Sequence, residues 1–284
     1  MRFVTLDREN YSEPAVMLDD ELVGLGGAGF TDMISVIQGG EDAMDRIRRW
    51  LYSPPGGEIV KAGSIPLLAP IPRPPKIICM GLNYREHAAE GTHQPAAVPT
   101  VFAKYPTAAT GHGRPIILPK NSAKPDYEAE LAVIIGRRGR HVPQENWRDY
   151  VFGYTAFNDV SARDVQNATS QWVMGKSFDT FAPFGPAIVT ADEIPDPQSL
   201  DIVLTLNGEV MQSSNTREMI FPIPEVIAYL SSVFTLEPGD VIATGTPAGV
   251  GFARRPPRWL RPGDEVRISI TGIPDLVNPI VAEG

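Results

Sequence analysis

The chain has 284 residues, of which 43% are hydrophobic and 21% are charged, and its net charge is −9 at pH 7. This composition excludes an extensively disordered protein, and the length predicts one or two folded domains. The acidic balance, with no basic cluster outside residues 254–258, predicts no binding to nucleic acid or to an anionic membrane surface.

Residues 1–70 are predicted to form a small N-terminal domain. A strand at residues 1–6 is followed by a hairpin at 15–25 that turns at Asp19-Asp20, and a helix near 42–51 has apolar residues at three- and four-residue spacing. The first ten residues are charged and lack an apolar signal region, and no apolar run approaches 18 residues. We therefore expect a cytoplasmic protein. A proline-rich connector at 66–75 leads into the second domain, residues 71–284.

The second domain opens with a buried strand at 76–81, which contains the only cysteine, Cys79. An unpaired buried thiol suits a reducing compartment. Asn83 can then cap a helical turn in which His87 and Glu90 lie on the same face. A carboxylate beside an imidazole fixes its tautomer and raises its basicity. A surface ion pair is the alternative, and the polar segment that follows, 91–100, is a candidate flap over a site.

An acidic stretch at 126–136 leads into a run of aliphatic residues that predicts a buried strand. Because side chains two apart on a strand share a face, Glu128 and Glu130 should lie side by side, and two buried carboxylates require a proton or a cation. The alternative is a solvated loop. Asp159, at the end of the next predicted strand, is a candidate third carboxylate. Lys176, among aromatic and small residues, should either extend to solvent or contact an anion.

The C-terminal third combines strong structural signals with one glycine-rich turn. Residues 201–212 predict a hairpin closed by Asn207-Gly208, and Pro224, together with the apolar stripe around it, predicts the start of a core helix. The segment 243–251 lacks the lysine of a phosphate-binding loop, so its amides and the Thr246 hydroxyl would suit a carboxylate better than a nucleotide. We expect the basic residues at 254–258 to form a solvated loop.

Five motifs, in the same order along the chain, resemble those of the fumarylacetoacetate hydrolase family, and in particular its bacterial acylpyruvase and 2-hydroxyhepta-2,4-diene-1,7-dioate isomerase branch. They are Gly81-x-Asn83-Tyr84-x-x-His87-x-x-Glu90, Asp126-Tyr127-Glu128-x-Glu130-Leu131, Gly153-Tyr154-x-x-x-Asn158-Asp159-Val160-Ser161-x-Arg163-Asp164, Gly175-Lys176-Ser177-Phe178-Asp179 and Pro238-Gly239-Asp240-x-Ile242-x-Thr244-Gly245-Thr246-Pro247. The resemblance implies a strand-rich α+β fold, a mixed β-sandwich roll behind a small N-terminal domain, and a homodimer.

The resemblance also implies a set of site residues. Mg²⁺ or Mn²⁺ would be held by Glu128, Glu130 and Asp159, which agrees with the preference of these ions, and of Ca²⁺, for oxygen ligands. His87 and Glu90 would activate water. The substrate would face Arg163, Gln166 and Lys176, and its carboxylate would lie near Thr246.

We therefore expect a metal-dependent hydrolase that cleaves a C–C bond in a 2,4-dioxo acid, either an acylpyruvate or a fumarylacetoacetate-like compound, with a small carboxylate-bearing substrate. An oxaloacetate decarboxylase or a keto–enol isomerase of the same fold is the alternative, because both reactions pass through an enolate. A non-catalytic metal-binding protein is a third possibility, but it would have no use for His87, Glu90 and Lys176.

Overall fold

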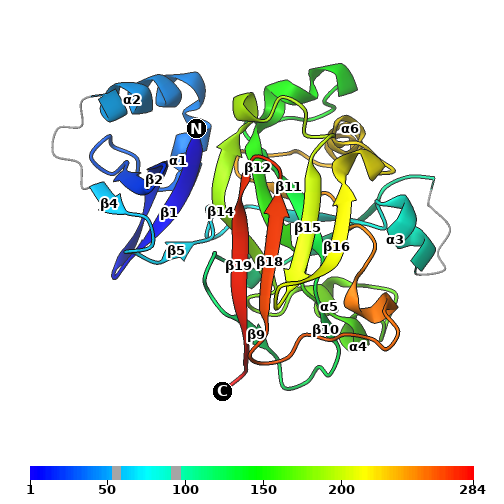
Figure 1. The fold of residues 1–284 in the computed structure, drawn as a ribbon. Helices are drawn as coiled ribbons and strands as arrows, with labels where there is room; N and C mark the ends of the chain where they lie inside the picture. Colours follow the sequence, from blue (N-terminus) through cyan, green and yellow to red (C-terminus); the bar gives the residue numbers. More distant parts are fainter. Residues whose placement is uncertain (53–58, 91–96) are drawn as a thin grey trace.

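The computed structural model describes residues 1–52, 59–90 and 97–284, and Figure 1 shows the path of the chain. Among these residues, no helix combines the length and the apolar character needed to cross a membrane.

Residues 1–52 and 59–70 form antiparallel strands that pack against two helices. The turn at Asp19-Asp20 joins β2 to β3, as predicted. Phe3 and Val16 of the sheet share a buried cluster with Met33 and Ile47 of the helices. Helix α1, which the sequence pattern did not predict, begins after Asp32, whose side chain accepts a hydrogen bond from the Ser35 amide. The elements are β1 (Arg2–Arg8), β2 (Tyr11–Leu18), β3 (Glu21–Gly24), α1 (Met33–Gln38), α2 (Gly40–Tyr52), β4 (Ile59–Lys61) and β5 (Leu67–Leu68).

One large mixed sheet runs through most of the chain in the order β4-β3-β2-β1-β14-β12-β11-β17-β6-β7, with β5 paired to β1 and β8 paired to β14. Strand β1 joins β14 through the pairs Arg2↔Val189 and Phe3↔Ile188, so the N-terminal strands extend the sheet of the remaining chain. The β17–β6 and β14–β8 pairs are parallel. The further strands are β6 (Ile77–Gly81), β7 (Thr100–Lys104), β8 (Ala109–Thr110), β11 (Ala129–Ile135), β12 (Val151–Asn158), β14 (Ala182–Thr190) and β17 (Val241–Ala243).

A second sheet, in the order β16-β15-β18-β19-β9, packs against β11, β12 and β14 and lies in front of them in Figure 1. Buried side chains from the two sheets, such as Leu131 and Ile268, form the main core. The Asn207-Gly208 turn closes the β15–β16 hairpin with φ angles of 54° and 83°, as predicted. The strands are β9 (Ile116–Leu118), β15 (Asp201–Leu206), β16 (Glu209–Asn215), β18 (Glu265–Ile270) and β19 (Ile273–Ala282). Two packed mixed sheets with few helices confirm the predicted strand-rich α+β fold.

Short elements continue from the ends of β11 and β12 and position the candidate site. Strands β10 and β13 form a small sheet, which is followed along the chain by α4 and α5. The predicted core helix is α6, and its first residue, Ile223, is buried. The elements are α3 (Arg85–Glu90), η1 (Pro106–Ala108), β10 (Pro125–Asp126), η2 (Gln144–Tyr150), β13 (Ser161–Ala162), α4 (Arg163–Gln166), α5 (Val173–Lys176), η3 (Ala191–Glu193), η4 (Thr216–Glu218), α6 (Ile223–Val233) and η5 (Gly251–Ala253).

Candidate metal centre and active-site cavity

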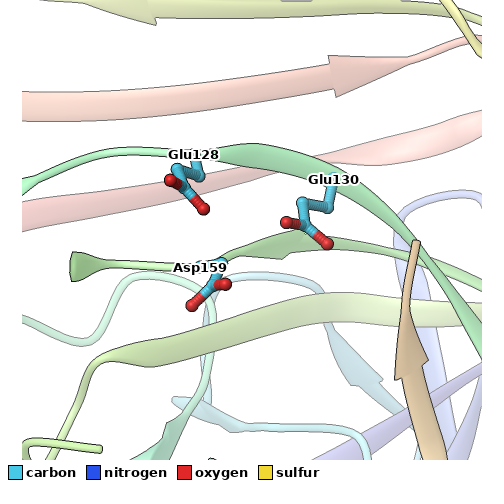
Figure 2. Close-up of side chains that lie close together, drawn as sticks. All are labelled: Glu128, Glu130 and Asp159. Carbon is cyan, nitrogen blue, oxygen red and sulfur yellow. The ribbon is translucent and has the colours of Figure 1, made fainter. Parts of the chain in front are cut away.

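The three predicted metal ligands come together in the interior. Glu128 precedes β11, Glu130 lies within it, and Asp159 follows β12, which pairs with β11 through Ala129↔Asn158. The Asp159 amide also donates to the Glu128 carbonyl at 2.9 Å. Oxygen atoms of the three carboxylates lie within 4.8 Å of one another, and the residues are 5%, 1% and 0% exposed. Figure 2 shows that the three side chains lie close together. Because all three are buried, the alternative of a solvated loop is wrong.

Three buried cations contact this cluster. Lys176 donates to Glu128 Oε2 at 2.8 Å and to Asp159 Oδ2 at 2.7 Å. Arg163 Nη2 lies 2.6 Å from Glu128 Oε1. Lys104, at the end of β7, donates to Asp159 Oδ1 and to the Val160 carbonyl. Lys176 therefore contacts anions and does not extend to solvent, which decides between the two expectations for it. The role of Lys104 was not predicted.

The charges of the cluster leave one carboxylate without a cationic partner. Glu128, Asp159 and the neighbouring Asp126 are each paired with a lysine or an arginine. Glu130 is the exception: no lysine or arginine of the described residues forms a salt bridge with it, and its carboxylate accepts a hydrogen bond from the Gly245 amide at 2.7 Å. Burial, reinforced by the negative charges of Asp159 and Glu128, raises the pKa of Glu130 well above its ordinary value.

Glu128 shows the opposite behaviour. Burial alone would raise the pKa of its carboxyl, but the ammonium of Lys176 and the guanidinium of Arg163 outweigh burial and hold the pKa well below its ordinary value. The cluster thus contains charged carboxylates together with one buried carboxylate that requires a proton or a further cation. Because all three candidate ligands offer oxygen, the residues fit Mg²⁺, Mn²⁺ or Ca²⁺ better than zinc.

His87 and Glu90 also come together, on helix α3. The Nδ1 atom of His87 lies 3.3 Å from Glu90 Oε2, and Glu90 Oε1 accepts a hydrogen bond from the Gly249 amide at 2.9 Å. His87 is 6% exposed, so this pair is not a surface ion pair. Asn83 does not cap the helix as expected. Its side chain instead bonds the backbone of Phe221 and Thr244, which ties the start of this segment to two distant loops. Of the candidate flap, residues 91–96 lie outside the described residues.

A cavity of about 830 Å³ opens over the cluster. Two of the predicted site residues do not line the cavity but contact residues that do: Glu90 bonds His87, and Asp159 bonds Lys176. The other seven line it: His87, Glu128, Glu130, Arg163, Gln166, Lys176 and Thr246. Gln166 accepts a hydrogen bond from Arg163 Nη1 at 3.1 Å, and the Thr246 hydroxyl accepts one from Gln212 at 2.8 Å. The lining residues that the sequence did not indicate include Phe102, Lys124, Trp172, Phe252 and Trp259.

The basic segment at 254–258 is the expected solvated loop only in its middle, because residues 255–257 are exposed whereas Arg254 and Arg258 are half-buried. Arg254 donates to the Met211 carbonyl at 2.7 Å, and Arg258 pairs with Asp264 at 2.8 Å. These contacts hold the segment against the cavity, where the Phe252 ring packs 4.8 Å from the guanidinium carbon of Arg163. The Asp126 carboxylate accepts hydrogen bonds from the Phe252 amide and from Arg163 Nε, which fixes both walls.

Comparisons with known proteins agree with this geometry. The family model described as fumarylacetoacetate hydrolase C-terminal matches residues 76–281. The chain is 40% identical over 293 residues to the mitochondrial oxaloacetate tautomerase Fahd2a of Rattus norvegicus, covering 99% of this chain and 92% of that protein. Its structure resembles that of maleylpyruvate hydrolase from Sphingobium sp. SYK-6 in complex with manganese(II) and pyruvate, with a TM-score of 0.85, 33% identity and full coverage of both chains. Fumarylacetoacetate hydrolase from Exiguobacterium antarcticum is 35% identical, with a TM-score of 0.86 and full coverage. The chain belongs to the fumarylacetoacetate hydrolase family.

Proposed function

We propose that this protein is a divalent-metal-dependent enzyme that interconverts the enol and keto forms of oxaloacetate, a four-carbon 2-oxo dicarboxylate. The observation that carries the proposal is the 40% identity to an oxaloacetate tautomerase across 99% of this chain. A keto–enol isomerase was the alternative expected from the sequence, and this full-length likeness favours it over the C–C hydrolase.

The buried carboxylates supply the binding side of the proposal. Glu128, Glu130 and Asp159 would hold Mg²⁺ or Mn²⁺, which when bound would stabilise negative charge on the oxygens of a 2-oxo acid and of its enolate. Lys176 has three N–H donors, of which two bond Glu128 and Asp159. The third can donate to the C2 oxygen of the substrate and offset the charge that develops there.

Tautomerisation moves a proton between C3 and the oxygen on C2, so it needs a group that takes the proton from carbon and returns it. The hydrogen bond to Glu90 assigns the ring proton of His87 to Nδ1 and leaves Nε2 as an acceptor. His87 lines the cavity and is the candidate base. Glu90 itself is fixed by the Gly249 amide, so the imidazole is oriented by a supported partner.

Hydrolysis of a 2,4-dioxo acid is the second candidate function. The same His87–Glu90 pair could take a proton from water, and the likeness to maleylpyruvate hydrolase, whose structure holds manganese(II) and pyruvate, favours this chemistry. Decarboxylation of oxaloacetate would pass through the same enolate. A non-catalytic metal-binding protein is less well supported, because the cavity places an oriented imidazole and a buried lysine beside the carboxylates.

One panel separates these functions. Purified protein with saturating Mg²⁺ or Mn²⁺ is incubated separately with oxaloacetate, an acylpyruvate and fumarylacetoacetate. Three signals are measured: the decay of the enol absorbance, the pyruvate released from oxaloacetate, and the acids released by hydrolysis. We expect acceleration of enol decay without matching release of pyruvate. Fast acylpyruvate hydrolysis with no effect on oxaloacetate would replace the tautomerase with the hydrolase.

We also propose that the protein is a homodimer, that it consists of two domains at residues 1–70 and 71–284, and that it is cytoplasmic. The Rattus norvegicus relative, by contrast, is described as mitochondrial. Light scattering on the purified chain tests the dimer, and limited proteolysis followed by mass spectrometry tests whether cleavage concentrates near residue 70.

A further inference from the structure

The cations that line the cavity differ in whether their charge is already balanced. Arg163 contacts the carboxylates of Asp126 and Glu128, and Lys176 contacts those of Glu128 and Asp159. Lys124 is the third lining cation, and no carboxylate of the described residues forms a salt bridge with its ammonium group within 4.0 Å. Among the described residues that line the cavity, Lys124 is therefore the lysine or arginine that is available to an incoming anion.

The backbone of Lys124 is held at the edge of the cavity. Its carbonyl accepts a hydrogen bond from the Arg163 amide at 2.9 Å. The next residue, Pro125, pairs with Ala162 in the small sheet. The position of the Lys124 Cα is thus fixed beside the first residue of α4, whereas its side chain is exposed. A four-carbon stem on a fixed backbone can follow a ligand over several ångströms.

One further acid at this edge of the cavity is already hydrogen-bonded. Asp164 lines the cavity, but its carboxylate accepts hydrogen bonds from the Ser122 hydroxyl and the Ala123 amide, both at 2.7 Å. These bonds satisfy Asp164 locally, and it forms no salt bridge with Lys124. Lys124 therefore carries its positive charge at the edge of the cavity without a carboxylate of the described residues in direct contact.

A dicarboxylic substrate would bring two negative charges into this cavity, and each needs a cationic partner. One carboxylate and the 2-oxo group would occupy the Glu128, Glu130 and Asp159 end, and the second carboxylate would then enter a space in which the two other lining cations are already paired. Removing a carboxylate from water without a partner is costly, whereas a bond to an ammonium group is among the stronger hydrogen bonds.

We propose that Lys124 binds the second carboxylate of the substrate and gives the cavity a preference for 2-oxo dicarboxylates over 2-oxo monocarboxylates. This inference rests on the proposed function in assuming that the first carboxylate binds at the metal end. It makes Lys124 a specificity residue, and it requires no part in proton transfer.

Two stable hydroxy acids test the inference without turnover. Malate and 2-hydroxybutanoate share a four-carbon skeleton and differ in a terminal carboxylate against a methyl group. Calorimetry with saturating Mg²⁺ gives their affinities for the wild-type protein and for Lys124→Met, which keeps the length of the side chain without its charge. Lys124→Arg keeps the charge. Lys120→Met is the matched control, because Lys120 is an exposed neighbour that contacts Gly284 and does not line the cavity.

We expect the wild-type protein, Lys124→Arg and Lys120→Met to bind malate about tenfold or more tightly than 2-hydroxybutanoate, a difference of about 1.4 kcal/mol. Lys124→Met should lose that preference through weaker binding of malate alone, and its KM for oxaloacetate should rise by a similar factor. An undiminished preference in Lys124→Met, or no preference in the wild-type protein, would overturn the inference.

The assay keeps this inference separate from the proposed function. A malate preference that depends on Lys124, in a protein that does not tautomerise oxaloacetate, would support the specificity residue and reject the reaction. Efficient tautomerisation of oxaloacetate with an unchanged KM in Lys124→Met would support the reaction and reject Lys124 as the specificity residue. Melting temperatures of the variants verify that each is folded.

Discussion

Glu130→Gln and Asp159→Asn each replace one carboxyl group of the same cluster with a neutral amide, yet they should have different effects on the metal-free fold. Glu130 is 1% exposed and has no cationic partner within 4.0 Å among the described residues. Asp159 accepts hydrogen bonds from both Lys104 and Lys176. The first substitution removes a buried carboxyl group that has no cationic partner in the described part of the chain, whereas the second removes the negative charge that two buried ammonium groups share.

The magnitudes follow from this difference. Removing one partner of a buried ion pair costs about 3–5 kcal/mol. At roughly 2–4 °C per kcal/mol for a chain of this size, Asp159→Asn should lower the metal-free melting temperature by about 6–20 °C. Glu130→Gln should leave that temperature unchanged or raise it, since a glutamine oxygen can still accept from the Gly245 amide. Both substitutions remove a proposed ligand, so each should weaken metal affinity by more than the roughly 10- to 100-fold typical of residues behind the ligands.

Calorimetric melting in EDTA and at increasing Mg²⁺ measures both effects. The wild-type protein should gain about 2.7 kcal/mol of stability when free Mg²⁺ is 100 times its dissociation constant, and neither variant should gain that much at the same concentration. Glu41→Gln, at an exposed position of α2, is the control for the loss of a carboxylate elsewhere. Equal metal-free stability of the two variants would refute the charge account, and an unchanged metal-induced gain in Glu130→Gln would refute the ligand set.

Three further substitutions test other parts of the site. His87→Ala should slow tautomerisation by about 10²- to 10⁴-fold, the usual contribution of a general base, while calorimetry shows unchanged Mg²⁺ affinity; an equal loss of metal binding would contradict the assignment. Lys104→Met should lower the metal-free melting temperature and enlarge the stabilisation by Mg²⁺, because it leaves Asp159 with one cation fewer; a smaller metal-induced gain would show that Lys104 instead positions this carboxylate. Gly251→Ala would force a methyl group against the Arg258 carbonyl, so we expect a loss of about 1–3 kcal/mol in the free energy of unfolding and a raised KM for oxaloacetate. Wild-type values for both quantities would mean that this wall of the cavity can adjust to the extra methyl group.

Local rules predicted the parts of the site that depend on local geometry. Glu128 and Glu130 share a face because strand side chains alternate, and His87 and Glu90 meet because residues three apart on a helix are neighbours. The Asn207-Gly208 turn has a conformation that few other dipeptides adopt easily, so the hairpin was also predictable.

The residues that were missed depend on contacts between distant parts of the chain. Lys104 reaches Asp159 across 55 positions, and Asn83 bonds Phe221 across 138 positions. A lysine that ends an apolar strand gives no indication in the sequence of whether it meets water or a carboxylate. Lys124 became a candidate only when the structure showed that the other lining cations were already paired.

Hydrogen exchange at C3 of oxaloacetate in D₂O, followed by proton NMR, tests the central claim most directly, because each passage through the enol replaces a C3 proton. The proposed function predicts that wild-type protein with saturating Mg²⁺ exchanges these protons far faster than Mg²⁺ alone and faster than it forms pyruvate, and that His87→Ala loses this acceleration. Exchange at the rate of Mg²⁺ alone, or exchange that never exceeds pyruvate formation, would contradict a tautomerase.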